Sequence, residues 1–176
     1  MKILDLGCGN RKHPGAIGID LSPKSQADII HDLDRFPYPF PEDEFDVVIC
    51  DSILEHLNDI ILVMREVHRI TKAQGRIKVR VPYFSSVDAF ADPTHRHFFT
   101  YHSFEYFTEV GEYSFYTDFT FRILRRKIHF GRRGNILPGL SFLANRFPDF
   151  YERALAYLFP AQTIEFELEV VKDVLS

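Results

Sequence analysis

The sequence predicts an α/β fold with a mostly parallel sheet, and three patterns carry this prediction. Residues 3–6 and 16–19 are apolar runs too short for a helix, which is typical of strands buried in a parallel sheet. Residues 59–70 repeat apolar side chains at helical spacing, in Ile60, Val63, Met64 and Val67. Residues 164–172 alternate apolar side chains with glutamates, which predicts a final antiparallel strand with one exposed face.

A glycine turn follows the first strand. Gly7 and Gly9 carry no Cβ, so their backbone can approach a ligand closely. Asp20 follows the second run, and a carboxylate at the carboxyl end of a strand can accept hydrogen bonds from both hydroxyls of a ribose. Residues 7–15 include Pro14 and are shorter than a parallel crossover normally needs, so we expect a loop or single turn there.

Two classes of ribose-containing cofactor use such a turn. In the NAD fingerprint, a third glycine follows at a spacing of three and opens a phosphate-binding helix. Here that position is Lys12, and Asp20 lies closer to Gly7 than the roughly 20 residues expected in a dinucleotide site. An NAD-linked oxidoreductase is therefore disfavoured.

The segment Asp5-Leu-Gly-Cys-Gly-Asn10, together with Asp20, resembles the first motifs of class I S-adenosylmethionine-dependent methyltransferases, in particular small type 11-like members. Residues 45–51 and 52–57 resemble the family's fourth strand and the start of its next helix, and residues 71–82 resemble its turn and fifth strand. The resemblance implies a Rossmann-like methyltransferase fold. Its seven-stranded sheet would have the order 3-2-1-4-5-7-6 and end in an antiparallel hairpin.

The resemblance covers residues 1–82 and departs from the family in two places. Members usually carry one or two helices before the first strand that help to cover the cofactor, whereas this sequence begins in the strand. We therefore expect a shortened N-terminus and a cover supplied from elsewhere. Ala73 and Gln74 replace the Pro-Gly often seen before the fifth strand, while Gly75 remains.

The other elements complete this sheet. We predict a third strand at 27–31, an irregular connection at 36–44, a strand at 119–130 and a helix at 147–158. One face of that helix carries Phe147, Phe150, Tyr151, Ala154 and Leu158. Basic residues on the strand next to the final one either pair with its glutamates or form a surface for an anionic substrate or partner: Arg122, Arg125, Arg126 and Lys127. Arg132 and Arg133 would join that surface.

Composition limits the remaining choices. The 176 residues, 45% apolar, predict one domain over 1–176. A net charge of −4 does not indicate nucleic-acid binding. No apolar stretch reaches membrane-span length and Asp5 interrupts the first apolar run, so we expect no membrane span, no signal peptide and a cytoplasmic protein. Cys8 and Cys50 fall at ends of predicted core strands, so we expect buried thiols in a reducing compartment, with a disulfide or redox pair as the alternative.

Residues 83–118 are rich in aromatic side chains and histidine, a composition that suits a folded substrate lid. Within this segment, residues 92–100 resemble a stretch found in many small members of the family. In family terms, the loop after the fifth strand borders the pocket of the methyl acceptor. The sequence leaves the acceptor open between a small metabolite, a glycan or lipid-linked intermediate, a protein side chain and an RNA base.

The resemblance also implies which residues contact S-adenosylmethionine. Asp5 would anchor the glycine turn, and Asp32 would accept from the adenine amine, although a solvated turn acid is the alternative. The expected contacts are Gly7, Cys8 and Gly9 at the methionine end, Asp20 and Leu21 at ribose and adenine, Asp32 and Leu33 at adenine, and Asp51 and Ser52 beneath the sulfonium.

The chemistry follows from this cofactor, because a sulfonium methyl is already electrophilic and the protein must mainly orient the acceptor. His95 and His97 are the catalytic candidates, as bases that titrate near neutral pH, with Tyr83 nearby; each could instead be structural or orient the substrate. His56 would touch the methionine end or simply pack. Asp92, His95 and His97 have metal-ligand side chains but no fourth ligand at a recognisable spacing, so we predict no metal site.

The sequence thus predicts an S-adenosylmethionine-dependent methyltransferase with an unidentified acceptor. The alternative is a non-catalytic S-adenosylmethionine-binding module that acts with a partner chain, which the missing N-terminal cover and an exposed aromatic helix near Phe147 suggest. The same aromatic surface is compatible with a homodimer.

Overall fold

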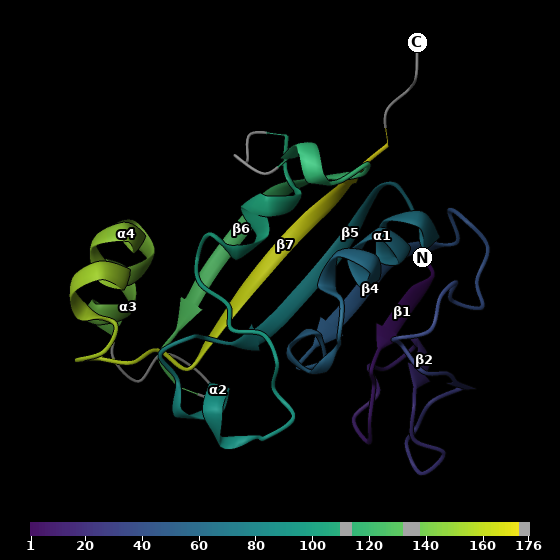
Figure 1. The fold of residues 1–176 in the computed structure, drawn as a ribbon, viewed down its shortest axis with the longest axis horizontal. Coiled ribbons are helices and arrows are strands. Elements are labelled where there is room, and N and C mark those ends of the chain that lie inside the picture. The colour runs from purple at the N-terminus through teal and green to yellow at the C-terminus, as the bar shows by residue number, and fades with distance from the viewer. Residues whose placement is uncertain (110–113, 132–137, 173–176) are drawn as a thin grey trace.

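The computed structural model describes residues 1–109, 114–131 and 138–172. A seven-stranded sheet runs through the chain in the order β3-β2-β1-β4-β5-β7-β6 (Figure 1). Neighbours from β3 to β5 are parallel, and β7 is antiparallel to both β5 and β6. The predicted Rossmann-like strand order is confirmed. The strands are β1 Ile3–Leu6, β2 Ile17–Asp20, β3 Ile29–Ile30, β4 Phe45–Asp51, β5 Thr71–Pro82, β6 Thr120–His129 and β7 Thr163–Val171.

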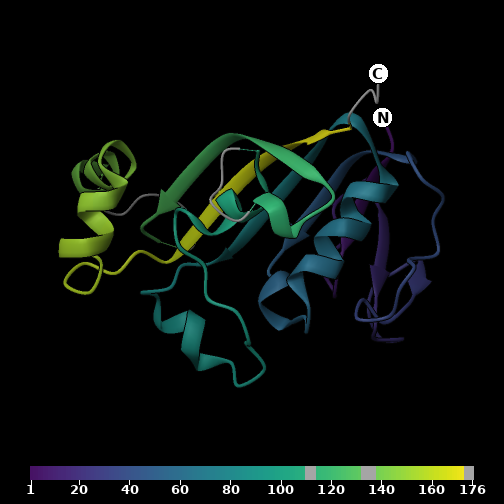
Figure 2. The same ribbon diagram turned by 45° about the horizontal axis from the view of Figure 1, so that its top comes forward.

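One face of the sheet is covered by α1, Ile60–Ile70, and by the 3-10 turn η2, Ser103–Phe107 (Figures 1 and 2). Asp59 caps α1, because its Oδ1 accepts from the backbone amides of Ile61 at 2.9 Å and Leu62 at 3.0 Å. The face of α1 that meets the sheet buries Val63, Met64, Val67 and Ile70. The turn η2 packs on the sheet through aromatic side chains: the ring centroids of Phe104 in η2 and Phe166 in β7 lie 4.5 Å apart.

The opposite face of the sheet carries charge. Along β7 the apolar residues are buried, while the glutamates point to the other side and each lies opposite a cation on both neighbouring strands. Glu165 lies opposite Arg80 and Lys127, Glu167 opposite Lys78 and Arg125, and Glu169 opposite Arg76 and Arg122. The predicted cross-strand pairing is confirmed for Arg122, whose Nη1 lies 2.8 Å from Glu169. Arg132 and Arg133 lie outside the described residues.

The structure confirms two predictions about the connections between strands. Residues 7–16 form turns without a helix, and residues 36–44 are irregular, as expected. β5 begins directly after α1, and its residue Gln74 adopts a left-handed conformation with φ +61°, at the position where the family often has glycine. Gly75 allows this turn to close, because a Cβ there would lie 2.5 Å from Thr71 Cγ2.

The predicted helix at 147–158 is wrong in its extent. Helical structure starts earlier, in α3, Pro138–Arg146, and resumes in α4, Pro148–Phe150, which continues into a wider turn over Tyr151–Leu155. Pro148 breaks the helix, because the residue before a proline is disfavoured in the helical region, and Phe147 has φ −134° and ψ 65°. None of the described helices is long and apolar enough to cross a membrane.

The apolar face predicted for that segment is mostly exposed, in agreement with the exposed aromatic helix expected near Phe147. Of its five residues only Tyr151 is buried, with its hydroxyl donating to the Phe159 carbonyl at 2.8 Å. Figures 1 and 2 show α3 and α4 beyond the β6 edge of the sheet, where no other described helix or strand lies over them. Phe147, Phe150, Ala154 and Leu158 are exposed.

A buried carboxylate ties α1 to the irregular connection before β4. Glu66 Oε2 accepts from the Tyr38 amide at 2.8 Å, and both of its oxygens lie 2.8 Å from the Arg69 guanidinium. Arg69 in turn donates to the Phe40 carbonyl at 3.0 Å. Burial opposes ionisation of Glu66, but the bonds from Arg69 and Tyr38 outweigh it and lower its pKa.

We predict that Glu66→Gln lowers the free energy of unfolding by about 1.5–3 kcal/mol at pH 7, because charge-assisted hydrogen bonds are lost. The folded pKa is lowered, so this stabilisation is present above the unfolded value of about 4.3 and fades as the pH falls through the folded value. The difference between variant and wild type should therefore shrink on acidification. Urea unfolding at pH 7 and at lower pH measures it.

The matched control is Glu109→Gln, which alters an exposed carboxylate. This change should stay within about 0.5 kcal/mol of wild type. A loss no larger for Glu66→Gln than for Glu109→Gln would show that the buried network does not stabilise the connection.

Candidate functional site

Three parallel strands end at one edge of the sheet. β1 lies between β2 and β4, with Leu6 paired to Ile19 and Asp5 to Ile49. The residues that follow the three strands are therefore neighbours in space. In an open parallel sheet, ligands bind outside the carboxyl ends of the strands, where the crossovers diverge.

The glycine turn after β1 uses both of its glycines, for different reasons. Gly7 has φ +70°, and its amide donates to the Ile19 carbonyl at 2.8 Å. A Cβ at Gly7 would lie 2.4 Å from Ile53 Cγ1, so this glycine lets the segment after β4 pack against the turn. Gly9 has φ +51°, and a Cβ there would meet nothing within 4 Å. Open space therefore adjoins Gly9, where a ligand can approach the backbone.

Asp20 holds this turn against the end of β2. Its Oδ2 accepts from the Gly9 amide at 2.9 Å, and its Oδ1 accepts from the Ser22 amide at 2.8 Å. Each carboxylate oxygen has a further lone pair that can accept a hydroxyl. Leu21, the other residue expected here, is exposed beside it.

Asp5 anchors the far end of the loop between β1 and β2. It is 5% exposed, and its Oδ2 accepts from the His13 amide at 2.7 Å. Burial raises the pKa of Asp5, although the bond from His13 opposes this. Cys8 and Cys50 are both buried and free, as expected, and burial raises the pKa of the Cys8 thiol. They are packing residues rather than reactive thiols.

Asp32 and Leu33, which were expected to contact adenine, lie in the segment after β3. Asp32 is half-buried, and its Oδ1 accepts from the Asp34 amide at 3.1 Å. Leu33 is buried, and its carbonyl accepts from the Tyr38 hydroxyl at 3.0 Å. The sequence analysis did not predict that Asp34 binds Asn58 through the backbone amide at 2.8 Å and through the side chain at 2.6 Å. This pair fixes the segment to the start of α1.

Asp51 and Ser52 follow β4 as expected. Asp51 is exposed, and its Oδ1 accepts from the Ser52 hydroxyl at 3.1 Å. Ser52 has φ +57°, and its amide donates to the Arg80 carbonyl at 2.8 Å. This left-handed residue turns the chain so that Ile53 reaches Gly7.

A second cluster lies just beyond this turn. The 3-10 turn η1, Leu54–His56, meets residues 92–97, because the Arg96 amide donates to the Glu55 carbonyl at 2.7 Å. The cluster contains Glu55, His56 and His95. Burial raises the pKa of Glu55 to about 7, and burial also lowers the pKa of His56. Glu55 was not predicted from the sequence, where its only signal is an acidic residue shortly after the buried strand β4.

The two histidines expected to be catalytic are placed differently. His95 belongs to the cluster, and its Nδ1 donates to the Ala89 carbonyl at 2.9 Å. The Nε2 of His97 lies 2.8 Å from the Leu57 carbonyl, so this ring holds the segment against the end of η1. Asp92 is exposed, with its Oδ1 bound to the Thr94 hydroxyl at 2.7 Å. The three residues considered as metal ligands therefore have separate partners.

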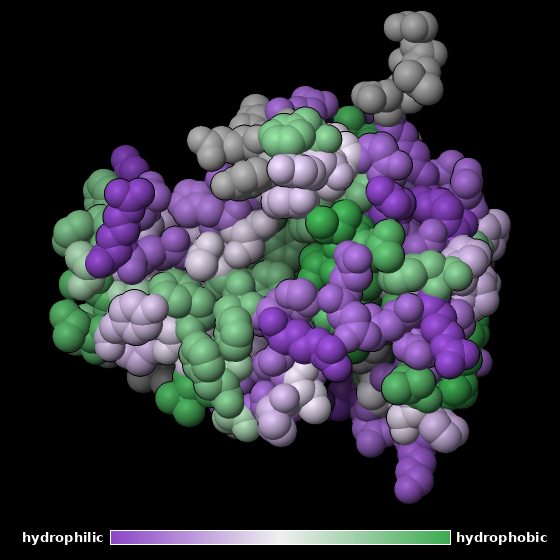
Figure 3. Space-filling view, in the orientation of Figure 1, coloured by the Kyte–Doolittle hydropathy of each residue, from purple (hydrophilic) through white to green (hydrophobic). Residues whose placement is uncertain are grey.

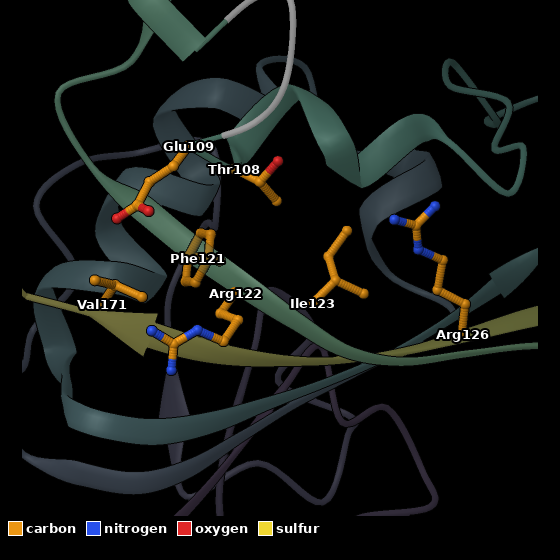
Figure 4. Close-up of a pocket in the computed structure, with 7 residues that line it drawn as sticks. All are labelled: Thr108, Glu109, Phe121, Arg122, Ile123, Arg126 and Val171. Atoms are coloured by element: carbon orange, nitrogen blue, oxygen red, sulfur yellow. The ribbon is translucent and has the colours of Figure 1, made fainter.

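A pocket of about 250 Å³ lies elsewhere, at the β6 edge of the sheet (Figure 4). Its cations are already paired: Arg126 lies 2.7 Å from Glu105, and Arg122 lies 2.8 Å from Glu169. No residue expected at the cofactor site lines it. We therefore place the candidate site at the carboxyl ends of β1, β2 and β4.

Comparison with known sequences finds a methyltransferase-domain match over part of the chain. The profile of that family matches residues 4–79, which include β2, β4 and all of β1 except Ile3. The uncharacterized methyltransferase YcgJ of Bacillus subtilis (strain 168) is 35% identical over 54 residues, which are 31% of this chain and 21% of the relative. The aligned segment thus spans about a fifth of that protein.

Solved structures share the fold over nearly the whole chain. An S-adenosylmethionine-dependent methyltransferase from Mesorhizobium loti has a TM-score of 0.60 at 16% identity, covering 96% of this chain and 90% of its own. A chain from the complex of the Haloferax volcanii Trm112 methyltransferase activator with a methyltransferase has a TM-score of 0.61 at 17% identity, covering 97% and 83%. At these identities the likeness shows the fold alone, and it agrees with the predicted fold class.

We predict that Gly7→Ala destabilises the chain more than Gly9→Ala. A left-handed alanine costs about 1–2 kcal/mol at either position. At Gly7 the contact with Ile53 adds about 1–3 kcal/mol of overpacking. Chemical unfolding of both variants measures the difference.

The control is a double-mutant cycle with Ile53→Ala, which removes the two atoms nearest to the added Cβ. Gly7→Ala should cost less in that background than in wild type. Equal costs in both backgrounds would mean that the close approach to Ile53 does not require glycine.

Proposed function

We propose that the chain is an S-adenosylmethionine-dependent methyltransferase, because residues 4–79 match the methyltransferase-domain family and the chain shares the fold of such enzymes. The observation that carries the proposal is the junction of Gly9 and Asp20. An open glycine backbone and a carboxylate with spare lone pairs lie next to each other at the carboxyl end of the sheet. A ligand with an amino-acid end and a ribose end matches this pair.

In this proposal, Gly7, Cys8 and Gly9 receive the methionine end of the cofactor and Asp20 accepts from the ribose hydroxyls. Leu21, Asp32 and Leu33 border the adenine. Asp51 and Ser52 lie beneath the sulfonium. Asp5 holds the loop between β1 and β2 by accepting from the His13 amide. The bound cofactor supplies an electrophilic methyl group, and the residues of the chain hold it in place and exclude water.

The fold disfavours NAD at the same site. A dinucleotide needs a helix N-terminus for its pyrophosphate, and residues 7–16 contain no helix. Lys12 stands where a third glycine would be, and its Nζ is 2.8 Å from Asp28. Its side chain also lies over Gly18, where a Cβ would meet Lys12 Cδ at 2.6 Å.

We propose that the acceptor binds beside residues 84–98. The predicted lid, residues 83–118, divides in two: Phe99, Phe104 and Phe107 are buried in the core and cover the sheet. The helix α2, Val87–Ala91, instead exposes Phe90, which stacks on Phe98 at 4.7 Å. An exposed aromatic pair next to the cofactor edge is a surface that an acceptor can cover.

We further propose different roles for the two histidines. His95 belongs to the acceptor side, because its Nδ1 is held by Ala89 and its Nε2 is left to face other groups. His97 is a positioning residue, because its Nε2 is bound to the Leu57 carbonyl.

A second candidate function is a non-catalytic S-adenosylmethionine-binding module that acts with a partner chain. The observation that favours it is the apolar surface around α3 and α4 (Figure 3). This surface exposes Phe142, Phe147, Phe150, Tyr157, Leu158 and Phe159. The Haloferax volcanii neighbour, which was solved together with its activator, shows that this fold can carry such a partner.

Calorimetric titration with S-adenosylmethionine, S-adenosylhomocysteine and NAD tests the proposal. Binding of both adenosyl ligands without NAD is the expected result, and binding of NAD alone would overturn it. Release of S-adenosylhomocysteine on addition of acceptor mixtures then separates an enzyme from a non-catalytic module.

We predict that Asp20→Asn weakens S-adenosylmethionine binding by about 1.5–3 kcal/mol, roughly 10- to 150-fold in Kd, because charge-assisted hydrogen bonds to the ribose are lost. Asparagine keeps one oxygen, which can accept from only one of the two amides that Asp20 binds, those of Gly9 and Ser22, so thermal unfolding must first show that the variant is folded. Titration of folded variant and wild type measures the change.

The matched control is Asp118→Asn, an exposed carboxylate paired with Arg65 at 2.9 Å. Its affinity for the cofactor should equal that of wild type. If Asp20→Asn also bound as tightly as wild type while folded, Asp20 would be removed from the ribose site.

A further inference from the structure

Glu55, His56 and His95 converge next to the proposed acceptor surface. One ligand atom of each lies within 4.8 Å of the other two. Glu55 and His56 come from the turn after β4, and His95 comes from the segment after α2, so the fold brings them together from distant parts of the sequence. From this geometry we propose that the three residues bind a divalent transition-metal ion of the zinc class, with a fourth position open to water or to an acceptor oxygen.

The strongest observation is the carboxylate of Glu55. The residue is 1% exposed, and neither Oε1 nor Oε2 has a hydrogen-bond partner among the described residues. Buried polar atoms without partners are rare, because their desolvation is not compensated. A metal ion bound to this carboxylate supplies the missing partner.

The two imidazoles are oriented as metal ligands are. His95 Nδ1 donates to the Ala89 carbonyl at 2.9 Å. His56 Nδ1 lies 2.8 Å from the Thr94 hydroxyl, which donates its own proton to Asp92 at 2.7 Å. Nδ1 is therefore the donor in both rings, and both Nε2 atoms carry lone pairs. Such outer hydrogen bonds fix the tautomer and orientation of metal-binding histidines.

The donor set selects the kind of ion. Two imidazole nitrogens and one carboxylate oxygen suit Zn²⁺ or a similar first-row ion, whereas Ca²⁺ and Mg²⁺ favour oxygen ligands. Three protein ligands are the number found in catalytic zinc sites, which keep one position open. Zinc bonds of about 2.0–2.2 Å would draw the three ligand atoms together around the ion.

This site differs from the set considered in the sequence. Asp92 accepts from the Thr94 hydroxyl, which in turn contacts His56 Nδ1, so Asp92 orients His56 through Thr94. His97 is bound to the Leu57 carbonyl. Of that set, only His95 is placed as a ligand. The consequence for function is that an acceptor with a hydroxyl or carboxylate could bind through the open position, where a metal ion lowers the pKa of a bound oxygen acid. Metal binding itself does not rest on the proposed methyl transfer.

The test is zinc titration of the full chain after treatment with a chelator. Calorimetry gives the affinity, and elemental analysis after gel filtration gives the stoichiometry. We expect one Zn²⁺ per chain, with binding weakened at least about tenfold in Glu55→Gln and in His95→Ala. Co²⁺ should compete for the same site and give a visible spectrum that Glu55→Gln removes.

His31→Ala is the matched control, since it removes a half-buried imidazole outside the cluster, whose Nε2 lies 2.9 Å from the Arg35 carbonyl. It should keep the zinc affinity of wild type. Thermal unfolding verifies that each variant is folded, and the near-isosteric Glu55→Gln keeps the test decisive if His95→Ala does not fold.

Two results would overturn the proposal. One is the absence of stoichiometric zinc in the folded wild type, which would leave protonation as the explanation for the buried carboxyl. The other is a zinc affinity that is unchanged in both folded Glu55→Gln and folded His95→Ala, which would assign the ion to a different set of ligands.

Discussion

The close approach of Gly7 to Ile53 is the constraint on which the site depends. It brings the turn after β1 within contact of the segment after β4, with no space for even one methyl group. The turn on one side leads to Gly9 and Asp20, and the segment on the other side continues into Glu55 and His56. The contact between the Gly7 backbone and the Ile53 side chain therefore fixes how the proposed cofactor residues lie relative to Glu55 and His56.

The remainder of the sheet supports this arrangement in an asymmetric way. α1 and η2 pack on one face, and the row of glutamates on β7 between two rows of cations keeps the other face hydrated. Glu66 and Arg69 then fix α1 to the connection that leads into β4. The position of β4, and hence of Ile53, is secured from the covered face.

The parts of the fold that sequence patterns predicted are those with local causes. A period of two reveals β7, and a period of 3.6 reveals α1. The helix near Phe147 was misjudged only in its extent, because the apolar spacing from Phe147 onward marks the part after the break at Pro148 and gives no sign of α3 before it. Likewise the convergence of Glu55 and His95 depends on tertiary packing, which no local pattern encodes.

The same distinction separates the two halves of the site. The residues proposed to hold the cofactor lie within residues 4–79, the range that the methyltransferase-domain profile matches. The residues proposed for the acceptor side lie beyond that range, such as Phe90, His95 and Phe98, and backbone contacts to Glu55 join their segment to η1. Family likeness thus bears on the proposed methyl-donor side. The proposed acceptor surface at residues 84–98 lies outside the matched range, so its role is best probed by substitution.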